Sequence, residues 1–325
     1  MVKKVVFGLF FLVLLALGAI LRNEPYWLHV IIVCIFSSML AMSWLLILKI
    51  GHLSLAHAAF MGIGGVSSAL LVKEAGLSFW LALPLSGLIA ATIAVVLGFP
   101  ILRVKGIYFL IVTFAFNELV GIIIRNWKFL GGYVGLIDVP RPNHLGGIDF
   151  SSKAHYYYLI LFLAVVTVIV LYRVYSSRIG RIFTSIGEDE DLAQSVGINV
   201  LKYKLLAFAI GCFFAGLTGS FVVHYLNFSG AEMYSTLQSL NIQIYAIVGG
   251  MGFAIGGPIV GAFFLILLVE FLDIPIKAQT LVYASILILV IFYLRGGLIT
   301  LPQKVLEGMT RLSKFRTKGT SHGTA

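Results

Sequence analysis

A serine and a histidine three residues apart, Ser54 and His57, are the side chains of this sequence that most resemble a hydrolytic pair. A nucleophile elbow needs the pattern Gly-x-Ser-x-Gly, and its histidine needs an acidic partner. The chain reads GHLSL up to residue 55, and no Asp or Glu accompanies His57. His52, His57 and His144 also lack the spacing of metal ligands. The sequence therefore predicts neither an intramembrane protease nor a metal site.

Other polar side chains stand inside long apolar segments. Asn117 and Glu118 interrupt one such segment, and Asn241 and Gln243 interrupt another. Polar groups at that depth in a membrane are costly, and they usually face the protein interior or a cavity. Two interpretations stay open, structural pairing and a place along a solute path. The candidate path residues are Ser54, His57, Asn117, Glu118, Asn241 and Gln243.

An acidic cluster occupies the stretch GEDEDLAQSVGIN, residues 187–199, although the whole chain has only 13 acidic residues. The absence of a breaker predicts one short helix over 188–196, with acids in its first turn, where the helix dipole favours them. Gly197 suits its C-terminal cap. Leu192 and Val196 form a small apolar stripe. The segment is either a docking element or a solvated loop.

The elements that position these residues are apolar. Hydrophobic residues make up 60% of the 325, charged residues 11%, and the mean hydropathy is +1.04. A soluble domain would carry roughly a quarter charged residues, and about 20 apolar residues suffice to cross a bilayer as a helix. We expect an all-α polytopic membrane protein with about ten transmembrane helices, or eight to ten. The predicted spans are 5–21, 27–48, 53–72, 79–102, 107–124, 156–171, 205–226, 238–254, 257–274 and 278–294.

Charge predicts the orientation. With the N-terminus inside, most of the 23 Lys and Arg fall on the cytoplasmic side, as the positive-inside rule requires. Both termini are then cytoplasmic, and the net charge of +10 faces anionic lipid rather than nucleic acid. We expect a transmembrane domain over 1–303, with a loop at 125–155 on the outer side, which is periplasmic if the chain is bacterial, and a cytoplasmic loop at 173–204. Residues 304–325 form a basic cytoplasmic tail.

Small residues recur at four-residue spacing in two glycine-rich regions, 51–65 and 249–261. This spacing lets helix backbones approach closely in lipid. The same glycines are compatible with a broken helix along a transport path. The two regions fall in the third and eighth predicted spans, which is compatible with an inverted repeat.

The acidic cluster also carries a family resemblance. Asp191-Leu192-Ala193 followed by Gly197 is similar to the E-A-A-x-x-x-G pattern of bacterial ABC-importer permeases. Nearly the whole chain, from about 30 to 300, resembles the permeases of branched-chain amino acid importers, in the LivM branch of the LivM/LivH group. Gly187 departs from this pattern, because the family has an arginine there. The blocks that carry the resemblance are SLAHAAFMGIGG (54–65), LRVKGIYFLIVTFAFNEL (102–119), NWKFLGGYVGLIDVP (126–140), GRIFTSIGEDEDLAQSVGINVLKYKLLAF (180–208) and VGGMGFAIGGPIVGA (248–262).

The resemblance implies a permease subunit in the plasma membrane of a bacterium or archaeon. It would pair with a second, related permease, two ATP-binding subunits and a periplasmic solute-binding protein. The cytoplasmic loop would couple it to the ATPase, with contacts through Glu188, Asp191, Ala193 and Gly197. The sequence has no P-loop of the G-x-x-x-x-G-K-[ST] type. We therefore expect no cofactor on this chain and no enzymatic activity of its own, with ATP and Mg²⁺ used by the partner.

Three alternatives remain at this level. Permeases that resemble this chain also carry urea or short amides. An ion-coupled secondary transporter would need membrane-embedded carboxylates, and Glu118 is the one placed deep enough in the sequence. A membrane scaffold or enzyme subunit without transport activity would not depend on the segment 187–199.

Overall fold

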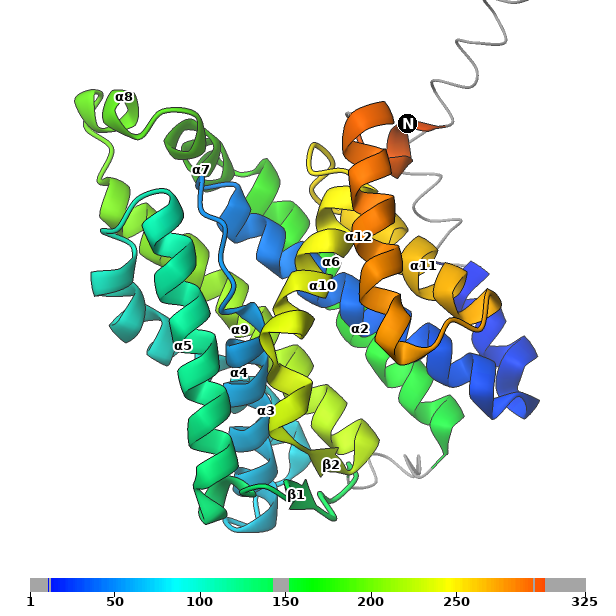
Figure 1. Ribbon diagram of the computed structural model, residues 1–325. Helices are drawn as coiled ribbons and strands as arrows, with labels where there is room; N and C mark the ends of the chain where they lie inside the picture. Colours follow the sequence, from blue (N-terminus) through cyan, green and yellow to red (C-terminus); the bar gives the residue numbers. More distant parts are fainter. Residues whose placement is uncertain (1–10, 12, 143–151, 295, 302–325) are drawn as a thin grey trace, which may run out of the picture.

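The computed structural model describes residues 11, 13–142, 152–294 and 296–301, and these are mostly helical (Figure 1). An apolar helix at Val13–Asn23 ends in the short η1, Leu21–Asn23. The start of the predicted first span and the predicted tail 304–325 lie outside the described residues. The remaining helices are α2 (Pro25–Leu48), α3 (His57–Lys73), α4 (Phe79–Ile101), α5 (Ile107–Asn126), α6 (Lys153–Ser176), α7 (Arg178–Glu188), α8 (Glu190–Ser195), α9 (Val200–Leu226), α10 (Thr236–Gly249), α11 (Gly256–Phe271) and α12 (Ile276–Tyr293).

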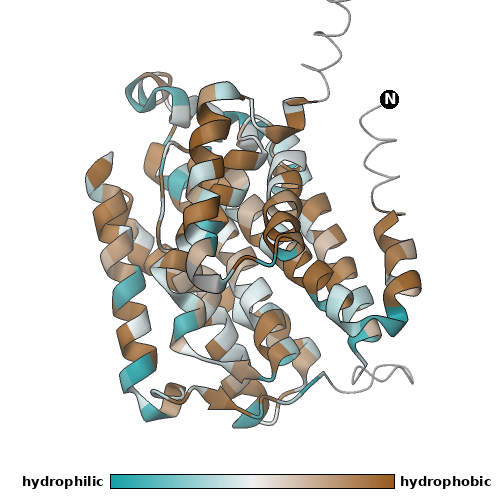
Figure 2. Cartoon of the chain, turned by 45° about the vertical axis from the view of Figure 1, so that its right-hand side comes forward, coloured by the Kyte–Doolittle hydropathy of each residue, from teal (hydrophilic) through white to brown (hydrophobic). Residues whose placement is uncertain are grey.

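Two helices form the centre of the bundle. In α2, which starts at Pro25 in the first helical position, 94% of the most apolar window is buried, and in α9 the figure is 78%. The helix α9 packs against α3 and α4, whereas α2 packs against α6, α10 and α11 (Figure 1). A helix that is apolar all round is a buried or membrane-embedded one. Hydrophobic residues run along most of the helices (Figure 2), and many large ones are exposed, for example Phe162 and Phe292.

The helical membrane fold is confirmed, whereas the expected number of spans is not. Within the described residues, five helices are long and apolar enough to cross a membrane: α2, α4, α5, α6 and α9. Shorter apolar helices occur at Val13–Asn23, α3, α11 and Ala278–Tyr293. The helices α3 and α10 are short because the chain is not helical at 49–56 and at 250–255. The count of ten spans and the inverted repeat remain predictions.

The glycine-rich regions bring helices into direct backbone contact. A methyl group on Gly64 would collide with the backbone of Gly216 in α9, and one on Gly219 would collide with the carbonyl group of Met61. The second region behaves alike, since a methyl group on Gly257 would collide with the carbonyl group of Gly250. Such contacts are typical of helix pairs whose small residues face each other. They support the packing interpretation of both regions.

The two long connections lie at opposite ends of the bundle (Figure 1). At one end, the strand β1 (Leu136–Ile137) pairs antiparallel with β2 (Phe228–Ser229), and the short helices η2 (Lys128–Leu130) and η3 (Ala231–Tyr234) flank them. At the other end, α7 and α8 fill the connection between α6 and α9. This separation agrees with the predicted assignment of the two loops to different sides of a membrane.

Candidate functional site

The acidic cluster holds the last residue of α7 and the first turn of α8. The short helix expected over 188–196 forms as α8, Glu190–Ser195, and it starts later than expected because Asp189 is extended, with φ −155° and ψ 110°, and separates α7 from α8. Its carboxylate accepts a hydrogen bond from the Leu192 N–H at 2.9 Å, which caps α8. A side-chain cap of this kind contributes about 1 kcal/mol to helix stability. The acidic residues therefore cap and begin α8, and Glu188 belongs to the end of α7.

Gly197 ends α8 in the way the sequence predicts. Its φ is +87°, a left-handed conformation that glycine adopts without steric cost. The Gly197 N–H donates to the Gln194 carbonyl oxygen at 3.0 Å, and the Ile198 N–H donates to the Ala193 carbonyl oxygen at 3.2 Å. These two bonds form a Schellman motif. A helix of only six residues is thus capped at both ends.

One side of α8 rests on the bundle and the other side is open. Ala193 is 3% exposed and packs in a small apolar cluster with Ile186 and Val200. In contrast, Leu192 is 63% exposed and Val196 is 71% exposed. The predicted apolar stripe therefore exists, and it points away from the protein. Of the predicted coupling residues, Glu188, Asp191 and Gly197 are exposed, and Ala193 anchors the helix.

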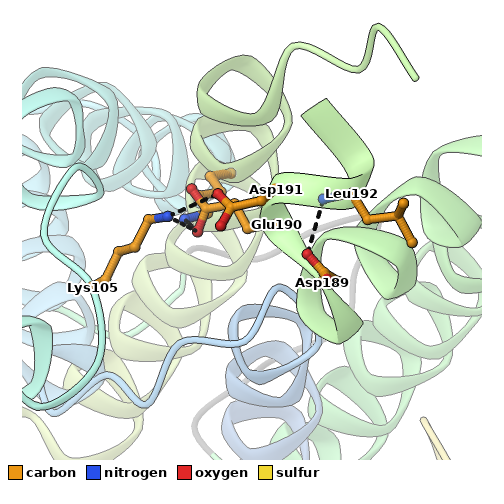
Figure 3. A network of polar contacts seen from close by, with 6 residues as sticks. Lys105, Asp189, Glu190, Asp191 and Leu192 are labelled. Carbon is orange, nitrogen blue, oxygen red and sulfur yellow. Dashed lines mark hydrogen bonds and ion pairs between the residues drawn. The ribbon is translucent and has the colours of Figure 1, made fainter. Parts of the chain in front are cut away.

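Two lysines hold the first turn of α8 (Figure 3). Lys204 of α9 lies 2.8 Å from the Glu190 carboxylate, and the lysine residue is 1% exposed. Lys105, in the connection between α4 and α5, lies 3.7 Å from Glu190 and 3.4 Å from Asp191. The two carboxylates raise the pKa of Lys105 above its usual value, with Glu190 the larger cause. The first turn of α8 is thereby tied to two neighbouring parts of the bundle.

The two ion pairs differ in strength. Lys105 and Asp191 have side chains 59% and 88% exposed. An exposed pair of this kind contributes about 0–1 kcal/mol. Lys204 is buried, so loss of its partner would leave an uncompensated charge, which costs about 3–5 kcal/mol. The Lys204–Glu190 pair is therefore the main electrostatic anchor of α8.

Sequence reasoning missed both lysines and Glu190. A signal was present, because Lys204 lies inside an apolar helix, where a charged residue needs a partner. Glu190 stands within the same acidic cluster as the predicted residues. Beside this anchor, a hollow of about 530 Å³ opens between α8, the end of α4 and the start of α9, and its lining includes Arg103, Glu190 and Lys204.

The end of α7 touches the connection that follows α2. A methyl group on Gly187 would collide with the Lys49 carbonyl group, and Gly51 lies against the backbone of Gly187. A side chain at this position would therefore not fit the contact as it stands. Next to it, His52 stacks on Phe109, with the ring centroids 4.3 Å apart. Burial lowers the pKa of His52 to about 4, with Lys204 as a further cause.

The same connection leads to a buried polar junction at the start of α3. The first N–H groups of a helix lack partners within the helix, and Ala56 at the N-cap of α3 offers no side-chain acceptor. The Asn117 amide oxygen instead accepts from the Ala59 N–H at 2.8 Å, and the Ser239 hydroxyl accepts from the Ala58 N–H at 3.0 Å. The Asn117 amide nitrogen donates to the Tyr234 carbonyl oxygen at 3.1 Å. Helices α5 and α10 thus cap α3 from outside.

Three further candidate path residues belong to this junction. The Ser54 carbonyl oxygen accepts from the Gln243 amide at 3.2 Å and from the Trp44 indole at 2.9 Å. His57 contacts the Ser43 hydroxyl through Nε2 at 2.8 Å. Ser54 and His57 are therefore neighbours in sequence that bond to different partners. The two side chains are not hydrogen-bonded to each other, because the Ser54 hydroxyl accepts from the Ala56 N–H and His57 contacts Ser43.

The remaining two candidates lie at the edge of the junction, and Glu118 is linked to it because the Thr236 hydroxyl accepts from the Asn117 amide nitrogen at 3.1 Å. Glu118 is exposed, and one of its oxygens accepts from the Thr236 hydroxyl at 2.5 Å. Asn241 is half-buried, and its amide oxygen has no hydrogen-bond partner among the described residues. The structure thus gathers Ser54, His57, Asn117 and Gln243 into one junction and leaves Glu118 on an open face.

Metal ligands are not grouped anywhere in the described part of the chain, which holds no cluster of three or more His, Cys, Asp or Glu suited to a metal ion. His144 lies outside the described residues. The expectation that the chain binds no cofactor stays a prediction.

Comparison with known proteins adds the family. Residues 26–294 match the family model of the branched-chain amino acid transport system permease component. The chain is 30% identical, over 283 residues, to the high-affinity branched-chain amino acid transport system permease protein LivM of Escherichia coli K12, which covers 79% of this chain and 66% of that protein. The same-named protein of Salmonella typhimurium LT2 is 33% identical over 226 residues, 62% of this chain and 53% of that protein.

The match therefore spans between about half and two thirds of the length of these relatives. A probable branched-chain amino acid transport permease protein LivM of Methanocaldococcus jannaschii is 23% identical over 141 residues, 43% of this chain. No solved structure matches the chain. Because the family model covers most of the chain and the fold is a bundle of apolar helices, the chain is a multi-pass membrane protein that belongs to the family of branched-chain amino acid transport permeases, of the LivM type.

Proposed function

We propose that this chain is the permease subunit of an ATP-driven importer in the plasma membrane and that its substrates are branched-chain amino acids. The relatives are named as permeases of that transport system, which supports the substrate class. We propose as partners a second related permease, two ATP-binding subunits that use ATP and Mg²⁺, and a periplasmic solute-binding protein. In this assembly both termini and α7–α8 face the cytoplasm.

The observation that carries the proposal is the construction of α8. It is a short helix, capped at both ends, anchored by Glu190 on a buried lysine, and it presents Leu192 and Val196 to the outside. A solvated loop has no need of paired caps or of an exposed apolar tip. A rigid short helix with exposed apolar side chains can bind in a groove on a partner protein, where buried apolar contacts supply most of the binding energy.

The proposed path of force runs from α8 to the membrane interior. Motion of the ATP-binding subunits displaces α8 and α7 together, because Ala193 packs on Ile186 of α7. At its end α7 presses on the connection 49–56 through the contact between Gly187 and Gly51. That connection ends at the first residue of α3, where Asn117 and Ser239 hold the helix start. A push at the surface thereby reaches a helix end deep in the bundle.

Substitution at Gly197 tests the coupling. In Gly197→Val the left-handed φ of +87° becomes strained, at about 1–3 kcal/mol, and α8 loses its C-terminal cap. We expect normal membrane insertion and a loss of leucine uptake of at least about tenfold when the variant is assembled with its partners in proteoliposomes.

Gly76→Val is the matched control. Gly76 also has a positive φ, +65°, and, like Gly197, has open space where a side chain would go, but it lies in the connection between α3 and α4. Uptake by this variant should stay near that of the unmodified chain. Normal uptake by Gly197→Val, or uptake that proceeds without ATP-binding subunits, would overturn the proposed coupling.

A further inference from the structure

The open face of α5 carries two opposite charges with a hollow between them. Glu118, Gly121, Ile122 and Arg125 all line a hollow of about 60 Å³. Their spacing of three, four and seven residues puts them on one side of the helix. Residues of η3 and Ser235 form the opposite wall.

This face does not suit lipid. Glu118 lies eight residues before the end of α5 at Asn126, which is about 12 Å along the helix. A carboxylate at such a depth faces the protein interior or a water-filled path. Since its side chain is exposed in the single chain, the space in front of it belongs to an aqueous path or to a subunit that encloses one.

Gly121 has no packing role. A methyl group there would meet no heavy atom within 4 Å, unlike the glycines of α3 and α9, whose missing side chains let backbones touch. A glycine inside a helix costs about 1 kcal/mol relative to alanine. The gain is room, because any side chain at 121 would stand between Glu118 and Arg125.

The charges are available to a ligand. Among the described residues, neither Glu118 nor Arg125 takes part in an ion pair, and Glu118 accepts a hydrogen bond from Thr236. Helical side chains lean toward the N-terminal end of their helix, so Arg125 leans back over Gly121. A small molecule with a cationic and an anionic end fits between the two.

We propose that the Glu118–Gly121–Arg125 face is a binding site for an α-amino acid zwitterion along the solute path. Glu118 accepts hydrogen bonds from the ligand ammonium group, and Arg125 donates to its carboxylate. Ile122, which is 53% exposed, contacts an aliphatic side chain. This inference rests on the proposed function for the direction of transport, and it favours amino acids over urea or simple amides, which lack charged ends.

Thiol labelling tests the site without requiring uptake. The chain has two cysteines, Cys34 and Cys212, and both are buried. Gly121→Cys therefore adds an accessible thiol for a sulfonated, membrane-impermeant methanethiosulfonate reagent that is supplied on both faces of the membrane. In the assembled transporter we expect labelling that excess L-leucine slows, because the ligand occupies the space above residue 121.

Val96→Cys is the matched control. Val96 is 66% exposed on α4 and, like Gly121, lies five residues before the last residue of its helix. It faces lipid in this account, so its thiol should stay unlabelled. If Gly121→Cys labels no faster than Val96→Cys, the path does not run along this face. If leucine gives no protection, the ligand class is wrong.

A charge variant adds a second measurement. Glu118→Gln keeps the shape and removes the charge, and we expect leucine uptake at subsaturating concentration to fall roughly 10- to 100-fold. Glu118→Asp should recover part of it. Unchanged uptake by Glu118→Gln would overturn the role of the carboxylate. A transporter that carries no leucine even when unmodified would refute the proposed function instead. The labelling of Gly121→Cys would still show whether this face is exposed to water.

Discussion

The anchor of α8 and the junction at the start of α3 are both polar clusters, and they use different chemistry. The anchor is ionic and lies at the end of the bundle, with one carboxylate partly exposed at 27%. The junction is neutral and buried, and it is built from amides, hydroxyls and backbone groups. The desolvation penalty of a charged pair is lower where water still reaches one partner. Deep in the bundle, uncharged hydrogen bonds satisfy the backbone groups instead.

The connection 49–56 joins the two clusters. It begins beside Gly187 of α7 and ends at His57, the first residue of α3. Three parts of this region therefore contribute to the stability of the protein: the ionic anchor, the neutral junction and the connection 49–56 between them. Each can be weakened by a single substitution or by pH.

Removal of one partner of the anchor should have the largest effect. Glu190→Ala leaves the Lys204 ammonium group buried without a partner, which we expect to lower the free energy of unfolding by about 3–5 kcal/mol. Thermal unfolding of the purified protein in detergent measures the change. The double variant Glu190→Met with Lys204→Met should recover most of the loss, because an apolar pair of similar volume can replace a buried ion pair.

Lys105→Met is the control for this prediction. It removes only the exposed partner, so the loss should stay below about 1 kcal/mol. If Glu190→Ala and Lys105→Met destabilise the protein equally, the burial of Lys204 does not matter and the contrast between the two pairs is wrong.

Removal of the amide at the junction should have the next largest effect. Asn117→Ala leaves the Ala59 N–H and the Tyr234 carbonyl group without their partners, at a combined cost of about 3 kcal/mol. Asn126→Ala is the matched control, because Asn126 is an exposed residue of α5 that donates to the Ile122 carbonyl oxygen. Its loss should be within about 0.5 kcal/mol. Equal thermal stability of the two variants would contradict the capping role.

Acidification should lower the free energy of unfolding by a smaller amount, through His52 in the connection 49–56. Burial lowers the pKa of His52 to about 4, whereas an unfolded histidine titrates near about 6.5. The unfolded chain therefore binds more protons between these values, and the stability that neutral His52 provides is present above pH 6.5 and is lost as the pH falls toward 4. At pH 5 the expected loss is about 2 kcal/mol.

The substitution His52→Phe isolates this term. It keeps the stacking on Phe109 and removes the titrating group. Unfolding temperatures measured at pH 7.5 and at pH 5 should differ more for the unmodified protein than for the variant. An equal difference in both would mean that other groups carry the acid sensitivity.

Much of the fold follows from local pattern. Runs of apolar residues predict α2, α4, α5, α6 and α9, because length and hydrophobicity suffice to identify a helix that crosses a bilayer. The position of Gly197 predicts the end of α8, since a left-handed residue at a helix end favours glycine. The apolar stripe of Leu192 and Val196 also follows from the sequence, and the structure adds that both side chains are exposed. These features depend on a few neighbouring residues.

Other features depended on partners distant in sequence. Asn117 reads as a polar residue with two open interpretations, and only the packing of α5 on α3 makes it a cap for Ala59. Lys204 reads as one of several cytoplasmic lysines, and only the fold of α8 brings Glu190 to it.

By itself, the sequence determined that the chain is a bundle of apolar helices and where the acidic cluster lies, because hydrophobicity and turn chemistry act over a few residues. The tertiary structure alone decided that the cluster splits at Asp189, that a buried lysine anchors it, and that Glu118 stands on an open face beside Gly121. Buried polar groups must find partners wherever packing provides them, and packing is a property of the whole chain.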